Sequence, residues 1–157
     1  MTYVTPLSDG ERFEAGDDRA RIIVSGNDTD GRYSLLEWTI AAAKKLGDAD
    51  ERDYGPHLHR RCEETFHIQK GSLEFLIGND VVTLNEGDFV RVPPGMNHGY
   101  QNVSGDDVKM LVTFTPGGLE ELFLKYRSDQ ENIRGAGFAS DATRYYGSEF
   151  GLKNPCV

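Results

Sequence analysis

Residues 55–71 read GPHLHRRCEETFHIQKG and residues 87–102 read GDFVRVPPGMNHGYQN, and these two stretches decide the fold. They hold all four histidines of the chain, and three of these, His57, His59 and His98, are candidate metal ligands. Two imidazoles at positions i and i+2 of a strand leave the same face about 6.6 Å apart, so His57 and His59 can reach one metal ion. A helix would turn these side chains roughly 200° apart. The spacing therefore predicts an extended segment that carries two metal ligands.

A carboxylate follows this histidine pair, and Glu63 and Glu64 are both candidates for it. On the strand expected here, Glu64 shares a face with Phe66, an apolar residue that suits the inside of a barrel, whereas Glu63 shares its face with His67. The phase of the strand favours Glu64 as the ligand and leaves Glu63 as the alternative. The same phase predicts that His67 faces outward.

The fourth candidate ligand is His98, which follows the turn 93–95 of sequence Pro-Pro-Gly. A turn of this type sets the direction of the chain immediately before a new strand, so His98 is expected to point back into the cavity. Three imidazoles and one carboxylate suit a divalent transition metal. The donor set leaves its identity open among iron, nickel, cobalt, manganese, copper and zinc.

Short runs of β-branched and aromatic residues predict an all-β fold with a barrel core at about 19–115. The runs recur at roughly ten-residue spacing, with turn residues between them, at 21–24, 33–40, 65–69, 73–77, 81–84, 89–92, 100–103 and 108–114. Apolar residues at helical spacing from Leu119 to Tyr126 predict an amphipathic helix packed outside the barrel, in a helical segment at about 117–147 with a second short helix at 141–146. The pattern does not define the role of the loop 42–54. The chain 1–157 is expected to form one domain.

The composition restricts the partners of the protein. The net charge is −9, with 26 acidic and 17 basic residues, so the surface should repel phosphate backbones and nucleic acid is not an expected partner. The sequence holds neither a signal-peptide pattern nor an apolar run long enough to span a membrane. Cys62 and Cys156 are predicted to be free thiols, as in a reducing cytoplasm, and the protein is therefore expected to be cytoplasmic.

The two opening stretches resemble the two motifs of the cupin superfamily, HxH-x4-E-x6-G and G-x5-P-x-G-x2-H-x3-N, at every fixed position. More narrowly, the chain is similar to the small single-barrel proteins grouped with flavonol (quercetin) 2,3-dioxygenases. The features that carry this likeness are the segment 24–33, the Pro-x-His-x-His stretch, and the segment 114–118 before the predicted helix. The resemblance implies a jelly-roll barrel, a homodimer, and an enzyme that uses dioxygen on an enol- or phenol-bearing aromatic molecule. Glu64 would then be the catalytic base as well as a metal ligand.

Two residues are candidates for the substrate pocket, because Phe66 and Tyr100 share a strand phase with a predicted ligand. Two other functional classes fit the same residues. One is a non-oxidative isomerase, cyclase, lyase or decarboxylase that uses the metal as a Lewis acid. The other is a cupin that binds a small ligand without catalysis.

Overall fold

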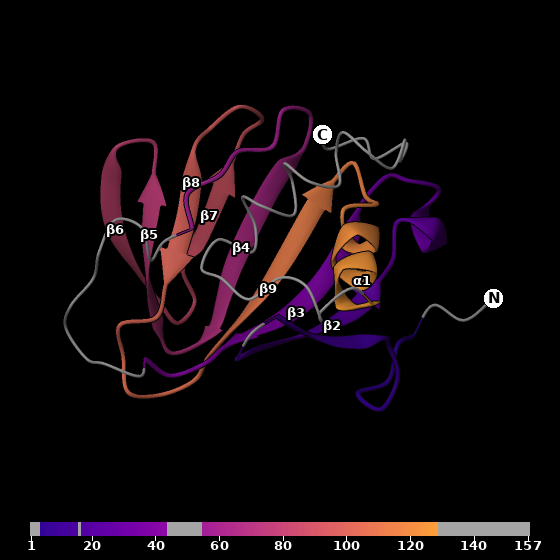
Figure 1. Cartoon of the computed structure of the whole chain (residues 1–157), viewed down its shortest axis with the longest axis horizontal. Helices are drawn as coiled ribbons and strands as arrows, with labels where there is room; N and C mark the ends of the chain where they lie inside the picture. The colour runs from indigo at the N-terminus through magenta and orange to yellow at the C-terminus, as the bar shows by residue number, and fades with distance from the viewer. Residues whose placement is uncertain (1–3, 16, 44–54, 129–157) are drawn as a thin grey trace.

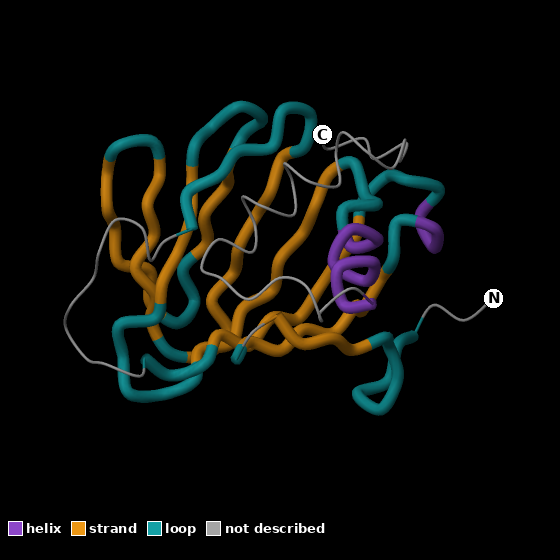
Figure 2. Tube along the Cα trace, in the orientation of Figure 1, coloured by secondary structure: helices purple, strands orange, loops and turns teal. Residues whose placement is uncertain are grey.

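The structure is a computed structural model, and it describes residues 4–15, 17–43 and 55–128. In this part of the chain two antiparallel β-sheets face each other, as Figures 1 and 2 show. The larger sheet has the strand order β1-β2-β3-β9-β4-β7 and the smaller one β6-β5-β8. The strands are β1 (Arg12–Ala15), β2 (Asp18–Val24), β3 (Ser34–Ile40), β4 (Glu63–Lys70), β5 (Ser72–Ile77), β6 (Asp80–Asn85), β7 (Phe89–Val92), β8 (His98–Gln101) and β9 (Val108–Thr115). This architecture confirms the predicted all-β fold.

The strands form because every second side chain is apolar and lies between the sheets. In β3, Leu36, Trp38 and Ile40 are buried, and the residues between them are only partly buried. Neighbouring strands continue the same inner face, since Trp38 is paired with Met110 of β9 and with Ala20 of β2. One continuous core therefore fills the space between the sheets and packs against strands β4 and β8.

Three local expectations need correction. Strand β1 was not predicted, because its charged residues alternate around a single buried side chain, Phe13, at the edge of the sheet. The pair His57 and His59 does not lie in a strand, since only His57 forms an isolated β-bridge, with His98. The segment 27–29, expected to be a turn, is a short 3-10 helix, η1 (Asn27–Thr29).

Helix α1 (Glu120–Ser128) follows β9 and lies at the end of the molecule away from strands β5 and β6, as Figure 1 shows. Its buried side chains Leu122 and Phe123 pack on inward-facing residues, because the ring of Phe123 lies 5.2 Å from that of Trp38 and 5.7 Å from that of Phe13. The helix therefore covers the inner side of the large sheet rather than the outer surface of the barrel. The rest of the predicted helical segment, including 141–146, lies outside the described residues.

Glu120 fixes the start of this helix. Its carboxylate is buried and accepts hydrogen bonds from the backbone N–H of Gly26, at 2.5 Å, and of Gly118, at 2.9 Å. Gly117 sits so close to Tyr33 that a Cβ atom there would come within 2.5 Å of its backbone carbon. The turn after β2 and the loop after β9 are thus joined tightly, and α1 is anchored at their junction.

The structure also bears on the expectations for membrane-spanning segments and for the cysteines. None of the helices in the described ranges is both long and apolar enough to span a membrane. Cys62 is disulfide-bonded, so the prediction of a free thiol at this position is wrong. Cys156 lies outside the described residues. The cysteines consequently no longer support the argument for a reducing compartment.

Candidate metal centre

The four predicted ligands come together between the two sheets. Glu64 is the second residue of β4 in the large sheet, and His98 is the first residue of β8 in the small sheet. The segment that carries His57 and His59 runs beside β8, because the backbone N–H groups of His57 and His98 each donate to the other residue's carbonyl at 2.9 Å. Two sheets and one loop thus hold the cluster, and its members lie far apart in the sequence.

The distances between the donor atoms fit ligands of a single ion. Oε2 of Glu64 lies 3.1 Å from Nε2 of His59 and 2.9 Å from Nε2 of His98. One ligand atom from each of the four residues lies within 4.8 Å of the others. Two ligands at right angles on one ion, each about 2.1 Å from it, would be about 3.0 Å apart. The donor set, which has three imidazole nitrogens and one carboxylate, and its spacing therefore suit a divalent transition metal.

The remaining ring nitrogens show how the imidazoles are oriented. Nδ1 of His57 donates to the carbonyl of Gly55 at 2.8 Å, and Nδ1 of His98 donates to the carbonyl of Met96 at 3.0 Å. A carbonyl oxygen can only accept, so each Nδ1 carries a proton and each Nε2 is turned toward the cluster. This arrangement is typical of metal-ligating histidines. Nδ1 of His59 is buried and has no hydrogen-bond partner within the described part of the chain.

Electrostatics inside the cluster separate the protonation states of its members. Burial raises the pKa of Glu64, but the hydrogen bonds from His59 and His98 outweigh it and lower that pKa to about 2. For His98, burial lowers the pKa, yet the hydrogen bond and charge of Glu64 raise it overall above the usual 6.5. Burial, together with the nearby His98, lowers the pKa of His57 to about 4. At neutral pH the cluster thus holds an ionised Glu64 and a neutral His57.

The structure places Glu64, and not Glu63, in the cluster. Glu63 lies on the outer face of β4, where its carboxylate forms an ion pair with Arg91 of β7. His67 shares that outer phase and contacts the side-chain amide of Gln69 at 3.0 Å. Strand phase alone distinguished these residues, because successive side chains of β4 alternate between the two faces.

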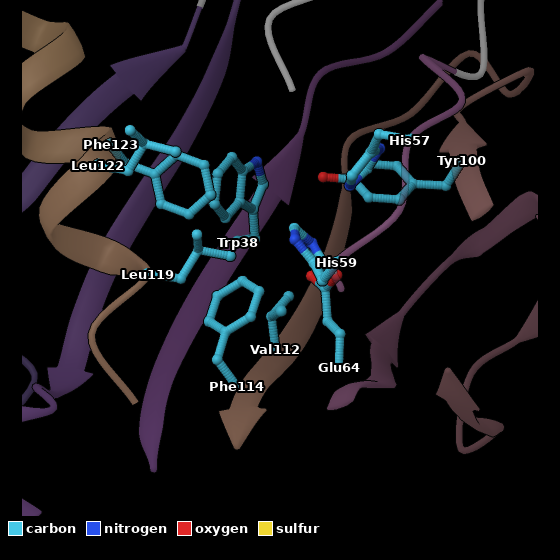
Figure 3. Close-up of a pocket in the computed structure, with 10 residues that line it drawn as sticks. All are labelled: Trp38, His57, His59, Glu64, Tyr100, Val112, Phe114, Leu119, Leu122 and Phe123. Atoms are coloured by element: carbon cyan, nitrogen blue, oxygen red, sulfur yellow. The ribbon is translucent and has the colours of Figure 1, made fainter. Parts of the chain in front are cut away.

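A small, mostly apolar cavity adjoins the cluster (Figure 3). It leaves about 40 Å³ of free space, which is room for about three water molecules. Tyr100 lies in its wall, whereas Phe66 does not line it: Phe66 is buried behind the cavity, with its ring 5.7 Å from that of Tyr100. The complete lining consists of Trp38, His57, His59, Glu64, Tyr100, Val112, Phe114, Leu119, Leu122 and Phe123.

The wall contributed by residues Leu119, Leu122 and Phe123 was missed by the sequence reasoning. The helical spacing of these residues predicted an apolar helix face, but periodicity does not say which surface such a face covers. The signal that could have located the wall is the short link 116–119 between β9 and α1, which keeps the start of the helix close to the end of β9.

Comparison with known proteins agrees with this geometry. Residues 48–114 match a family model described as a cupin domain. The chain is 27% identical over 123 residues to a quercetin 2,3-dioxygenase of Bacillus subtilis, and 34% identical over 108 residues to one of Aspergillus japonicus. These alignments cover 78% and 66% of this chain but only 34% and 29% of the relatives, so the chain spans about a third of their length.

Solved structures resemble it in fold. KdgF from Halomonas sp. superposes with a TM-score of 0.59 at 15% identity, covering 75% of this chain and 98% of the other. An RmlC-like cupin from Shewanella frigidimarina has a TM-score of 0.59 at 14% identity, covering 77% of this chain and 96% of the other. The resemblance expected from the two sequence motifs is confirmed.

Proposed function

Since this chain carries a cupin domain, we propose that it is a metal-dependent dioxygenase that acts on an enol- or phenol-bearing aromatic molecule of the flavonol type. The observation that carries the proposal is the convergence of His57, His59, Glu64 and His98 beside an apolar cavity. The two quercetin 2,3-dioxygenases with similar sequences support the choice of reaction. The four side chains would hold one divalent metal.

A bound divalent metal would supply Lewis-acid and redox chemistry beside the cavity. The protein's own part is to accept the hydroxyl proton of the substrate and to keep water away from the reacting carbons. Glu64 is the group placed to accept that proton, since its carboxylate is ionised and lines the cavity. Oε2 of Glu64 is in hydrogen-bond contact with Nε2 of His59 and of His98. The base role therefore requires both histidines to direct their Nε2 lone pairs to the metal, which frees Oε2 for the substrate proton.

The apolar wall would exclude water from the reaction. Val112 and Phe114 offer no hydrogen bond to water, and Leu122 and Phe123 of α1 add further apolar surface to the wall. Pockets for ligands of drug size measure about 300–1,000 Å³, far more than the 40 Å³ that is free here. A flavonol would therefore have to displace part of this wall, to which α1 contributes Leu122 and Phe123 and β9 contributes Val112 and Phe114.

The test compares Glu64→Gln with Glu63→Gln, a neighbouring carboxylate that lies outside the cluster. Each metal-loaded protein is assayed for oxygen uptake with a panel of flavonols, and its metal content is measured separately. We expect Glu64→Gln to lose turnover by at least about a hundredfold while retaining some metal, and Glu63→Gln to behave like the unmodified protein. Equal oxygen uptake by the two variants would reject the base role.

The same assay decides the reaction class. Substrate conversion that proceeds equally well without oxygen would replace the dioxygenase with a non-oxidative metal-dependent enzyme. If the purified protein holds no stoichiometric metal and added metal changes nothing, a non-catalytic ligand-binding role replaces both. The single domain over 1–157, the homodimer and the cytoplasmic location remain predictions that accompany this proposal.

A further inference from the structure

We propose that the hydroxyl of Tyr100 is a ligand-binding group, and that it donates a hydrogen bond to an oxygen anion bound beside the metal cluster. The inference rests on the metal site of the proposed function, and it narrows the ligand to an oxyanion such as an enolate, phenolate, carboxylate or hydroxamate. Tyr100 is the third residue of β8, two positions after His98.

The ring of Tyr100 is held firmly by the core. It packs against Phe66 at 5.7 Å and Phe75 at 5.5 Å between ring centroids, and both of these phenylalanines are almost fully buried. This packing restricts the direction of the side chain, because the ring rests against two buried rings that also contact each other. In the view of Figure 3 the ring overlaps that of His57, and its hydroxyl points into the space between His57 and Trp38.

The hydroxyl has no protein partner among the described residues. The aromatic contacts of its ring are with Phe66 and Phe75, and no hydrogen bond to its oxygen occurs in the described part of the chain. Tyr100 is only partly buried, so its hydroxyl remains able to donate to a molecule next to it. It lies in the wall of the cavity, which makes a molecule inside the cavity the available acceptor.

The chemistry of the cavity identifies that acceptor. Apart from the metal-site side chains and Tyr100, the lining is formed by apolar and aromatic residues. The free space is about 40 Å³, so an atom bound at the cluster also lies close to the other lining residues, including Tyr100. An anionic oxygen that contacts the metal can accept from Tyr100 at the same time, whereas a neutral nitrogen ligand has no lone pair left to do so.

The experiment uses the cobalt(II)-loaded protein and two probes with the same number of non-hydrogen atoms. Acetohydroxamate binds metals through oxygen, and imidazole binds through a nitrogen and then offers no acceptor. Binding of each probe is followed by the visible absorption of cobalt(II) in the unmodified protein, in Tyr100→Phe, and in Tyr33→Phe. Tyr33 is 42% exposed and lies outside the cavity, so it is the matched control.

We expect Tyr100→Phe to weaken acetohydroxamate binding by about tenfold or more, since a hydrogen bond to a charged acceptor is lost. Imidazole binding and cobalt affinity should stay unchanged, and Tyr33→Phe should alter none of the three. Phenylalanine retains the ring contacts with Phe66 and Phe75, so the variant should fold, and its urea midpoint verifies this.

Three results would overturn the inference. Unchanged acetohydroxamate affinity in Tyr100→Phe would show that the hydroxyl does not touch the ligand. An equal loss for both probes, or a loss of cobalt affinity, would show that Tyr100 supports the cluster itself. If the unmodified protein binds no cobalt, the proposed function fails and this inference fails with it, whereas absent oxygen uptake with intact probe binding affects only the proposed reaction.

Discussion

Metal binding should release a proton from His98, and the size of that release follows from the contacts of its ring. Both ring nitrogens face acceptors, Nδ1 the carbonyl of Met96 at 3.0 Å and Nε2 the carboxylate of Glu64 at 2.9 Å. A ring with acceptors on both sides is an imidazolium, in agreement with the raised pKa of His98. A metal can bind Nε2 only after the proton on that nitrogen has left.

The magnitude can be worked out at pH 6.5. The pKa of His98 lies above 6.5, so more than half of the molecules carry the extra proton at this pH. The pKa of His57 is about 4 and that of Glu64 about 2, so each retains a proton in fewer than about one molecule in a hundred. His98 should therefore contribute about one half to one proton per metal, and this contribution should fall toward zero at high pH.

Isothermal titration of the metal-free protein with nickel(II), in two buffers that differ in ionisation enthalpy, counts these protons directly. Because the proton competes with the metal, the apparent nickel affinity should also fall as the pH is lowered through the pKa of His98. His67→Gln is the control, since this histidine lies outside the cluster and its loss should leave the count unchanged. A release close to zero at pH 6.5 would show that His98 is already neutral, and would refute the reasoning.

Three other substitutions test the surroundings of the site. Glu120→Gln places an amide N–H₂ against a backbone N–H and should cost about 1–3 kcal/mol in urea unfolding, whereas Glu121→Gln on the exposed side of α1 should cost little. Phe123→Ala should lower the free energy of unfolding by about 3 kcal/mol. It should also enlarge the cavity and strengthen quercetin binding in a fluorescence titration. Leu124 does not line this cavity, so Leu124→Ala is the control and should not strengthen quercetin binding. Burial raises the pKa of Asp18 above the usual 3.8 despite the hydrogen bond from Ala41, so its ionisation opposes folding above that pH. Asp18→Asn should then raise the thermal unfolding temperature at pH 7 and leave it nearly unchanged at pH 3.

The sequence was sufficient to place the cluster because its information is local. Alternation along β4 separates Glu64 from Glu63 and His67, and a turn of restricted geometry precedes His98. Phe89–Val92 and most other strands coincide with predicted runs to within three residues at either end, since each run is apolar on one face and bounded by turn residues.

Features that depend on contacts between distant segments were not predictable in this way. Glu120 looks like an ordinary acidic residue in the first turn of a helix, and only the approach of Gly26, 94 positions earlier, makes it a buried anchor. The apolar face of α1 was visible in the sequence, but its position over the cavity was not. Edge strand β1 was not predicted from the sequence, because Phe13 is its only fully buried side chain.

Glu64 is a hydrogen-bond partner for the imidazoles of His59 and His98. Their Nε2 atoms therefore have a polar contact inside the protein even without a metal. The rest of the interior is a continuous apolar core shared by both sheets, most of which lies away from the histidines. A strong chelator should therefore abolish the proposed metal-dependent activity without unfolding the protein, and activity should return when an ion is supplied. Small zinc-dependent domains differ, because they unfold when the metal is removed. Such a scaffold can exchange one metal for another, so the ion it carries in a cell would reflect which metals are abundant there as much as the preference of the site.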